Sequence, residues 1–186
     1  MVANAVVSEV QRGVGSFDGF RHLKPIDNDN TTPQRLGWLW EQLSKNCDYA
    51  FTDFTRGKID YFLEQFTSEG VEFFELEDAG LVMIENPTPA GSAFIHYVVW
   101  DRAGYTTQQQ RNSAREMFDY LFYNKRVHHV AGLIPSFNQH AVRLASSMGM
   151  KYEGEIRENF LYRGKYFNHL IYGLLESEYR VRRGRL

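Results

Sequence analysis

Cysteine, proline and long apolar runs are scarce in this sequence. Its 186 residues include one cysteine, Cys47, and five prolines. A single cysteine excludes an internal disulfide and a zinc site built from several thiolates, and it indicates a reducing compartment such as the cytoplasm. No run of eighteen apolar residues is present, so we expect no membrane-spanning helix. Residues 1–10 carry Glu9 in place of the basic flank and long apolar stretch of a signal peptide, so a secreted protein is not expected.

A surplus of either charge is also absent. The 21 basic and 23 acidic side chains give a formal net charge of −2, which excludes a generally basic surface of the kind that coats nucleic acids. The exception is the C-terminal end, with Arg180, Arg182, Arg183 and Arg185. We expect these arginines to form a solvated tail, and they are the one segment suited to an RNA, a DNA or an acidic partner.

Apolar residues, by contrast, are plentiful. They make up 43% of the chain, and 14 phenylalanines, 11 tyrosines and 3 tryptophans supply large flat side chains for a core. The length corresponds to about one domain at roughly 150 residues per domain. This composition excludes a disordered chain and predicts one globular domain.

Four segments have apolar residues at positions i, i+3, i+4 and i+7, which predicts four amphipathic helices. Thr32 and Pro33 mark the start of the first helix. Ser136 with Gln139 three residues later predicts a capping box for the fourth, and Gly149 marks its end. The four apolar stripes are Leu36, Leu39, Trp40 and Leu43; Ile59, Phe62, Leu63 and Phe66; Ala114, Met117, Phe118 and Leu121; and Ala141, Leu144, Ala145 and Met148.

Runs of aromatic and β-branched residues between these helices predict strands. The short polar links from residue 71 to residue 100 predict an antiparallel meander of three strands. A helix separates the third of these strands from the next one, so the two are expected to be parallel neighbours. The last two strands form a closing hairpin. The predicted strands cover residues 20–25, 71–76, 81–84, 93–100, 127–134, 152–162 and 166–175.

These elements predict an α/β domain (α+β) with a mixed sheet of about seven strands and about four helices. We expect residues 1–18 to be a loosely held N-terminal segment, residues 19–179 to form the domain, and residues 180–186 to be a basic tail.

The most specific sequence pattern lies between residues 133 and 179 and resembles the C-terminal half of enzymes that acetylate ribosomal-protein N-termini. These enzymes belong to the GCN5-related N-acetyltransferase (GNAT) superfamily, and the chain is similar in particular to the short-loop, divergent members that tailed phages carry. The order of elements extends the resemblance from about Gly19 to Tyr179. The residues that carry it are Ile134-Pro135-Ser136-Phe137-Asn138, Ala141, Leu144, Met148-Gly149-Met150, Glu153-Gly154, Arg157, Gly164, Tyr172-Gly173-Leu174, Glu176 and Glu178-Tyr179.

The resemblance implies the GNAT fold and acetyl-CoA as cosubstrate. In the family, two strands splay apart and the pantetheine arm pairs with exposed strand backbone, which corresponds here to Val98, Val99 and Trp100. The resemblance also implies a role for Asn138, mainly architectural, at the start of the last helix.

A second implied contact is a turn that holds the pyrophosphate on backbone N–H groups at the start of a helix. The family places Gln or Arg, two residues, Gly, one residue, and then Gly or Ala there. This chain has Asn112 in place of the first Gly, and Asn tolerates a positive φ. Replacing Asn112 by Gly restores the residue of the family pattern, so it is expected to preserve or strengthen acetyl-CoA binding. The implied contact residues are Gln109, Arg111, Asn112, Ser113 and Ala114.

Acetyl transfer to an amine uses a base for the amine and an acid for the departing thiolate. Many family members place a Tyr seven residues after the Asn that starts the last helix, but this chain has Ala145, so either another group serves or the thiolate leaves unaided. His96 is the candidate base, with Glu72 and Glu75 as alternatives. His128 and His129 are adjacent in a predicted strand and point to opposite faces, so we propose no metal site.

The sequence therefore supports an acetyl-CoA-dependent N-acetyltransferase that acts on a primary amine, either a protein N-terminus or a lysine. The alternative is a non-enzymatic GNAT-fold protein, such as a phage structural or accessory component with a decayed cofactor site. Asn112 and Ala145 favour this alternative. A third reading is a nucleic-acid-associated or ribosome-associated factor that binds through the arginine segment.

Overall fold

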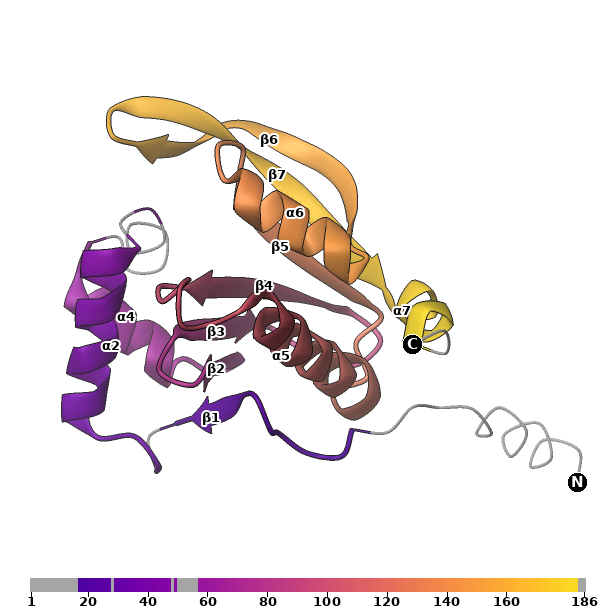
Figure 1. Ribbon diagram of the computed structural model, residues 1–186, viewed down its shortest axis with the longest axis horizontal. Helices are drawn as coiled ribbons and strands as arrows, with labels where there is room; N and C mark the ends of the chain where they lie inside the picture. The colour runs from indigo at the N-terminus through magenta and orange to yellow at the C-terminus, as the bar shows by residue number, and fades with distance from the viewer. Residues whose placement is uncertain (1–16, 28, 48, 50–56, 184–186) are drawn as a thin grey trace, which may run out of the picture.

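A computed structural model describes residues 17–27, 29–47, 49 and 57–183. Seven strands form one mixed sheet in the order β1-β2-β3-β4-β5-β7-β6, with helices on both faces (Figure 1). The expected α/β class and the seven-stranded mixed sheet are confirmed. The elements are β1 (Lys24–Ile26), α2 (Pro33–Asn46), α4 (Ile59–Thr67), β2 (Val71–Glu75), β3 (Gly80–Glu85), β4 (Ser92–Val99), α5 (Thr107–Asp119), a π-helical turn η1 (Tyr120–Asn124), β5 (His129–Pro135), α6 (Gln139–Met148), β6 (Lys151–Tyr162), β7 (Lys165–Leu175) and α7 (Glu176–Arg183).

The strand pairings follow the sequence-based prediction. Strands β2, β3 and β4 form the antiparallel meander, and β6 and β7 form the closing hairpin. Strands β4 and β5 are parallel, but only three residue pairs join them, the last being Phe94 with Ala131. Beyond this point β4 pairs only with β3, and β5 pairs only with β7. The sheet therefore splits between β4 and β5, as predicted.

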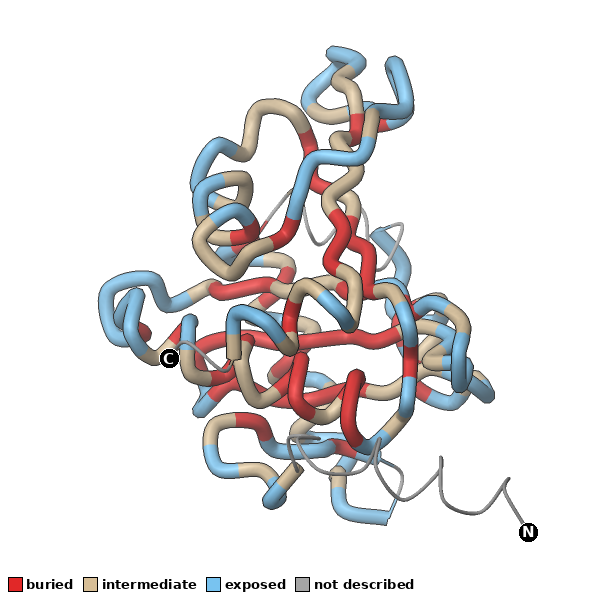
Figure 2. Tube along the Cα trace, turned by 90° about the vertical axis from the view of Figure 1, so that its right-hand side faces the viewer, coloured by how far each residue is buried: buried red, intermediate tan, exposed pale blue. Residues whose placement is uncertain are grey.

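The two faces of the sheet bury two separate apolar cores, because side chains alternate between faces along each strand. Helices α5 and α6 lie on one face, where Met117, Phe118 and Leu121 pack against the strands. Helices α2 and α4 lie on the other face, where Leu39 and Phe62 are buried. Figure 2 shows the buried residues running through the centre of the molecule between these layers.

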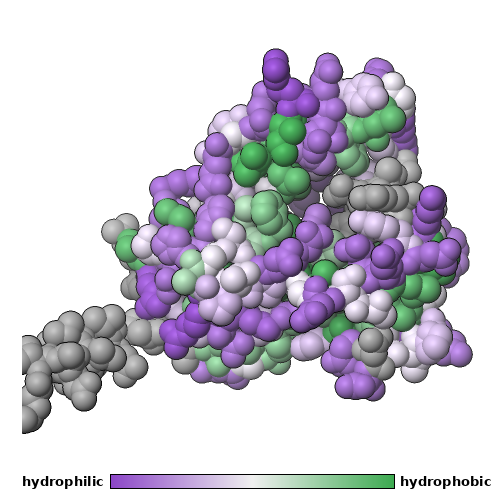
Figure 3. Space-filling model, turned by 180° about the vertical axis from the view of Figure 1, so that it is seen from behind, coloured by the Kyte–Doolittle hydropathy of each residue, from purple (hydrophilic) through white to green (hydrophobic). Residues whose placement is uncertain are grey.

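One face of the molecule is seen in Figure 3. Seen from behind in Figure 3, hydrophilic side chains cover much of the molecule and apolar ones gather in separate patches. Among the helices that the structure describes, none combines the length and apolar character needed to cross a membrane.

The four predicted helices are present as α2, α4, α5 and α6. Thr32 caps α2 by accepting a hydrogen bond from the Arg35 N–H, and Pro33 stands at the first helical position. The predicted capping box at Ser136 is wrong, because the cap of α6 is Asn138, whose side-chain oxygen accepts the Ala141 N–H at 3.2 Å. The expected left-handed residue at the end of α6 is Gly149, with φ of 96°.

A fifth helix, α7, corrects the expectation of a loosely held basic tail. It runs through Arg183, and Tyr179 within it is 4% exposed. The Tyr179 hydroxyl donates to the Asp119 carboxylate at 2.9 Å, and the Arg183 guanidinium pairs with the same carboxylate at 2.9 Å. The segment is therefore docked on α5 up to Arg183, while Arg185 lies outside the described residues.

The expectation of a loosely held segment at residues 1–18 stays a prediction, because the structure describes only Phe17 and Asp18 of it. Residues 1–16 lie outside the described residues, but Phe17 packs against Phe20, with ring centroids 4.8 Å apart. The predicted strand at 20–25 shortens to β1, because the Glu116 carboxylate on α5 accepts the backbone N–H groups of residues 21–23. These three backbone N–H groups bind the Glu116 side chain and not a neighbouring strand. Residues 21–23 therefore pass α5 as an irregular segment.

Candidate active site

A cleft of about 90 Å³ opens where β4 and β5 separate. Since strand residues direct N–H and C=O groups to alternate edges, part of the β4 backbone beyond Phe94 faces this gap without a strand partner. A Cβ atom at Gly132 would lie 3.3 Å from the Ile95 carbonyl oxygen, so glycine allows the strands to stay close where the cleft begins. The cleft is lined by Tyr49, Ile95, His96, Tyr97, Val98, Gly132, Leu133, Ile134, Pro135, Asn138, Ala141, Leu144, Ala145, Met148 and Met150.

Helix α6 forms one wall of the cleft with its apolar stripe. Ala145 is buried, whereas Ala141, Leu144 and Met148 are only half-buried. These four residues are the stripe that predicted the helix, and all four line the cleft. The incomplete burial of an apolar helix face thus coincides with the cavity.

His96 is the only one of the three sequence-predicted bases that lines the cleft. Its Nε2 atom lies 3.4 Å from the Glu85 carboxylate on the neighbouring strand, and the side chain is 20% exposed. The hydrogen bond from His96 lowers the pKa of Glu85 below its usual value. Glu85 is therefore ionised at neutral pH and lies beside the imidazole.

The alternative bases have other partners. Glu75 is 3% exposed and receives two hydrogen bonds from the Arg35 guanidinium, at 2.9 and 2.5 Å. Glu72 accepts the Tyr120 hydroxyl at 2.7 Å and pairs with Lys125. Neither carboxylate lines the cleft, and both are held in ion pairs.

Tyr49 is a candidate residue that the sequence analysis missed. It lines the cleft, its ring meets that of Phe137 edge-on at 6.0 Å, and its hydroxyl hydrogen-bonds with the side chains of Asn138 and Arg102. Burial raises the pKa of Tyr49 above its usual value, and the two hydrogen bonds only partly offset this effect. No pattern of spacing marks this residue, since it lies between the two predicted helices.

Of the three backbone positions expected to pair with pantetheine, one lines the cleft and the other two do not. Val98 lines the cleft. The Val99 carbonyl accepts the Cys47 thiol at 3.8 Å, and burial raises the pKa of that thiol to about 11. The Trp100 N–H donates to the Ala79 carbonyl at 2.9 Å, so it is not available to a ligand in this arrangement.

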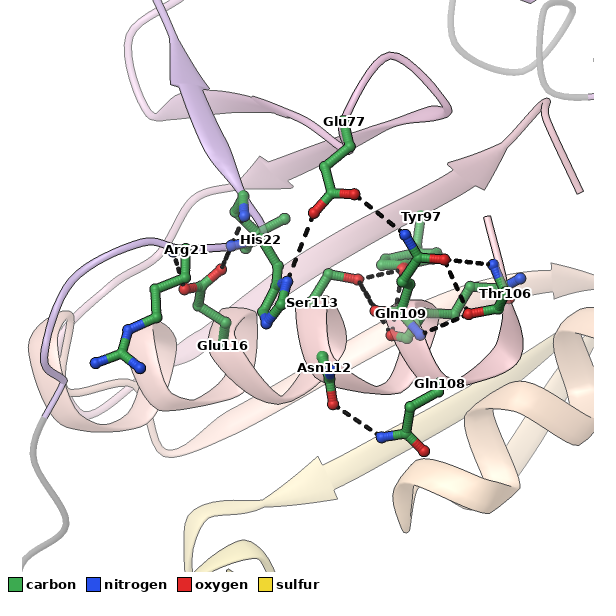
Figure 4. A network of polar contacts seen from close by, with 12 residues as sticks. Arg21, His22, Glu77, Tyr97, Thr106, Gln108, Gln109, Asn112, Ser113 and Glu116 are labelled. Atoms are coloured by element: carbon green, nitrogen blue, oxygen red, sulfur yellow. Dashed lines mark hydrogen bonds and ion pairs between the residues drawn. The ribbon is translucent and has the colours of Figure 1, made fainter. Parts of the chain in front are cut away.

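The expected anion-binding turn at residues 109–114 is helical, which corrects the prediction of a positive φ at Asn112. Helix α5 begins at Thr107, and Thr106 caps it in a reciprocal box with Gln109 (Figure 4). The Thr106 hydroxyl accepts the Gln109 N–H at 3.3 Å, and the Gln109 amide oxygen accepts the Thr106 N–H at 2.9 Å. This box fixes the helix start several residues earlier than the family pattern implies.

The other residues of this segment face different surroundings. The Ser113 hydroxyl is fully buried and lies 2.7 Å from the Tyr97 hydroxyl, and Ala114 lies in the core. Asn112 accepts a hydrogen bond from the Gln108 side chain at 2.9 Å. Arg111 lines a second pocket, between α5, α6 and α7.

Anion donors at the start of α5 are therefore few. The Asp101 carboxylate in the preceding loop accepts the N–H groups of Ala103, at 3.2 Å, and Gly104, at 2.8 Å. Within the described residues, the N–H groups of Thr107 and Gln108 donate no hydrogen bond. These two donors, at the positive end of the helix dipole, are the ones available to a phosphate.

No protein-family model matches the sequence, and no curated protein matches it. Solved structures do match the fold. The spermidine N-acetyltransferase of Vibrio cholerae in complex with CoA and spermine aligns with 85% of this chain and 98% of its own, at 18% identity and a TM-score of 0.64. A chimera of this enzyme, SpeG, with hSSAT aligns at 19% identity over 86% of this chain and 98% of its own, with a TM-score of 0.66.

The chain has the GNAT fold. Two features of this fold position the candidate site. They are the split between β4 and β5 and the start of α5 after β4. Among the described residues, no group of three or more His, Cys, Asp or Glu side chains is arranged to hold a metal ion.

Proposed function

We propose that this GNAT-fold chain is an acetyl-CoA-dependent N-acetyltransferase that acts on a primary amine. The observation that carries the proposal is the cleft between β4 and β5, which His96 and Tyr49 both line. The likeness to solved N-acetyltransferases, one of them described with bound CoA, supports it.

The residues present fit acetyl-CoA. The apolar walls and the unpaired β4 backbone near Val98 suit the pantetheine arm, which has both methyl groups and amides. The N–H groups of Thr107 and Gln108 suit a phosphate at the start of α5. Bound there, acetyl-CoA supplies an acetyl group activated as a thioester.

Two side chains of the cleft then move the protons. The His96 imidazole accepts a proton from the attacking amine, and the Glu85 carboxylate stabilises the imidazolium that results. Tyr49 keeps its proton at neutral pH because burial raises its pKa, so its hydroxyl can donate to the departing sulfur. Asn138 and Arg102 hold that hydroxyl in place. Tyr49 would thus serve where many relatives have a Tyr and this chain has Ala145.

For the acceptor we propose a protein N-terminus or a lysine. The fold relatives named above are spermidine acetyltransferases, so a polyamine is the competing acceptor. A polyamine carries several positive charges, but no Asp or Glu is among the described residues that line the cleft. A single amine on a peptide needs fewer carboxylates, and Glu85 behind His96 is the one close by.

The test is a thiol-release assay with acetyl-CoA and a panel of amines: a peptide with a free N-terminus, the same peptide blocked at its N-terminus but containing lysine, spermidine and spermine. We expect CoA release and a peptide mass that increases by one acetyl group. Turnover with the polyamines alone would replace the protein acceptor by a polyamine. Binding of acetyl-CoA without turnover of any amine would contradict the enzymatic proposal.

One observation favours the alternative of a non-enzymatic protein with a decayed cofactor site. The Asp101 carboxylate and the Thr106–Gln109 box already bind most N–H groups around the start of α5. If these groups exclude phosphate, acetyl-CoA will not bind the folded protein, and the fold would then have a structural or accessory role.

A further inference from the structure

Two exposed arginines lie near the end of the cleft where α6 begins. Arg102 lies in the loop that follows β4, and its guanidinium hydrogen-bonds with the Tyr49 hydroxyl. The same hydroxyl hydrogen-bonds with Asn138, the cap of α6, so Arg102 stands beside both the helix start and the proposed proton donor. Arg143 lies further along α6.

No carboxylate in the described part of the chain balances this charge. Neither Arg102 nor Arg143 forms an ion pair with an Asp or Glu there, and no described Asp or Glu lines the cleft. The acid closest to Arg102 in sequence, Asp101, instead accepts the N–H groups of Ala103 and Gly104. The guanidinium of Arg102 has five N–H donors, so it can bind the Tyr49 hydroxyl and a ligand at the same time.

The neighbouring titratable groups respond to this positive charge. Burial lowers the pKa of His140, in the first turn of α6, and the charges of Arg102 and Arg143 lower it further. Burial raises the pKa values of Cys47 and Tyr49, and the charge of Arg102 opposes both rises. No carboxylate of the described residues acts on any of these three groups. His140 is therefore neutral at pH 7, and the positive charge at the cleft comes from the arginines.

We propose that the acceptor is a peptide N-terminus with an acidic side chain at its first or second residue, and that Arg102 selects it by binding that carboxylate. This inference rests on the proposed function. The amine reacts between His96 and Tyr49, so a carboxylate within two residues of it reaches the guanidinium bound to the Tyr49 hydroxyl. Arg143 adds attraction at longer range. The same charges repel a polyamine, which carries only positive groups.

The test measures kcat/KM for acetylation of peptides that have Asp at the first or the second residue, each compared with the same peptide carrying Asn there. We expect at least one Asp peptide to exceed its Asn partner by about fivefold or more, the upper range for one exposed ion pair.

Three variants locate the cause of this preference. Arg102→Gln should bring the Asp-to-Asn ratio within about twofold of one. Any loss of kcat through Tyr49 cancels in that ratio, because both peptides share it. Arg102→Lys keeps the charge and should retain more of the preference than Arg102→Gln. Arg126→Gln, at an exposed position before β5, is the matched control and should keep the native ratio. Melting temperatures verify that each variant is folded.

The outcomes separate the two proposals. If the native protein acetylates Asn and Asp peptides equally well, or if Arg102→Gln keeps the native ratio, this inference is wrong and the proposed function stands. Turnover of lysine side chains or polyamines alone would also overturn the inference, while an N-acetyltransferase remains. If no amine is acetylated, both proposals are wrong.

Discussion

At the scale of single residues, the two proposed proton carriers come from segments that are far apart in the chain. His96 lies on β4, and Tyr49 lies in the segment after α2. The carboxylate of Glu85 supports the first, and the amide of Asn138 supports the second. Each group therefore has a polar neighbour that holds it in place, and burial raises the pKa of Tyr49 so that its hydroxyl keeps the proton.

If His96 is the base, His96→Gln lowers kcat with acetyl-CoA and a reactive amine by roughly 10²-fold or more. The dissociation constant of acetyl-CoA should stay unchanged, because glutamine keeps a polar side chain of similar length. The control is His128→Gln, since His128 is exposed and lies outside the cleft. An unchanged kcat in His96→Gln would leave His96 a structural partner of Glu85.

Tyr49 has a pKa above the usual tyrosine value of about 10. A proton donor acts below its pKa, so the native kcat should show no alkaline fall up to about pH 9 from this group. Tyr49→Phe should lower kcat by roughly 10²-fold without changing acetyl-CoA binding. Tyr166→Phe, at an exposed position on β7, is the matched control. A Tyr49→Phe variant with native kcat would mean that the thiolate leaves unaided.

At the scale of elements, the start of α5 shows where local pattern and tertiary packing lead to different results. The family pattern predicts a glycine-like turn at Asn112, but the Thr106–Gln109 capping box starts the helix at Thr107. Ser113 and Ala114, now in the second turn, bury their side chains against the sheet. The segment stabilises the helix, and the N–H groups that we propose for a phosphate are those of Thr107 and Gln108.

Asn112 provides a direct test of this arrangement. In a helix interior, Asn112→Ala should be more stable to unfolding than Asn112→Gly by about 1 kcal/mol. In a turn with positive φ, the order would reverse, because alanine is strained there and glycine is not. Urea unfolding of the two variants measures the difference, and a more stable glycine variant would contradict a helical Asn112.

The docking of α7 has a similar test. Asp119 is 7% exposed and binds both Tyr179 and Arg183. Arg183→Gln removes a charged partner from this carboxylate and should cost about 1 to 3 kcal/mol of unfolding free energy. Arg180→Gln breaks the pair with Glu176 one turn away and the contact with the Tyr123 ring, and it should cost less than about 1 kcal/mol. Equal small losses in both variants would mean that α7 does not depend on Asp119.

Periodic patterns predicted most of these elements because burial on one face repeats every 3.6 or two residues. The four helices and most of the strands follow from such patterns. Helix α7 was missed because three arginines surround its one buried residue, Tyr179. The short β1 was overestimated because Glu116, some ninety residues away in sequence, binds the backbone before it. A contact between residues so far apart in the sequence leaves no pattern in the local sequence from which it could be predicted.

At the scale of the whole molecule, two cores hold the sheet together and leave a gap between β4 and β5. The strands part after three residue pairs, and the cleft opens there. His96, Val98 and Asn138 line this cleft, and the sequence had predicted the strand and the helix that carry them. Tyr49 could not be placed, because only tertiary packing brings it to Asn138.

The measurement that tests the account most directly is the melting temperature of the protein with and without acetyl-CoA. A ligand that binds only the folded state adds about 2.7 kcal/mol of stability at roughly 100 times its dissociation constant. For a chain of this length that corresponds to a rise of about 5 to 10 °C. We predict this rise with acetyl-CoA. A melting temperature unchanged by acetyl-CoA, in a protein with native circular dichroism, would contradict an acetyl-CoA site in this fold.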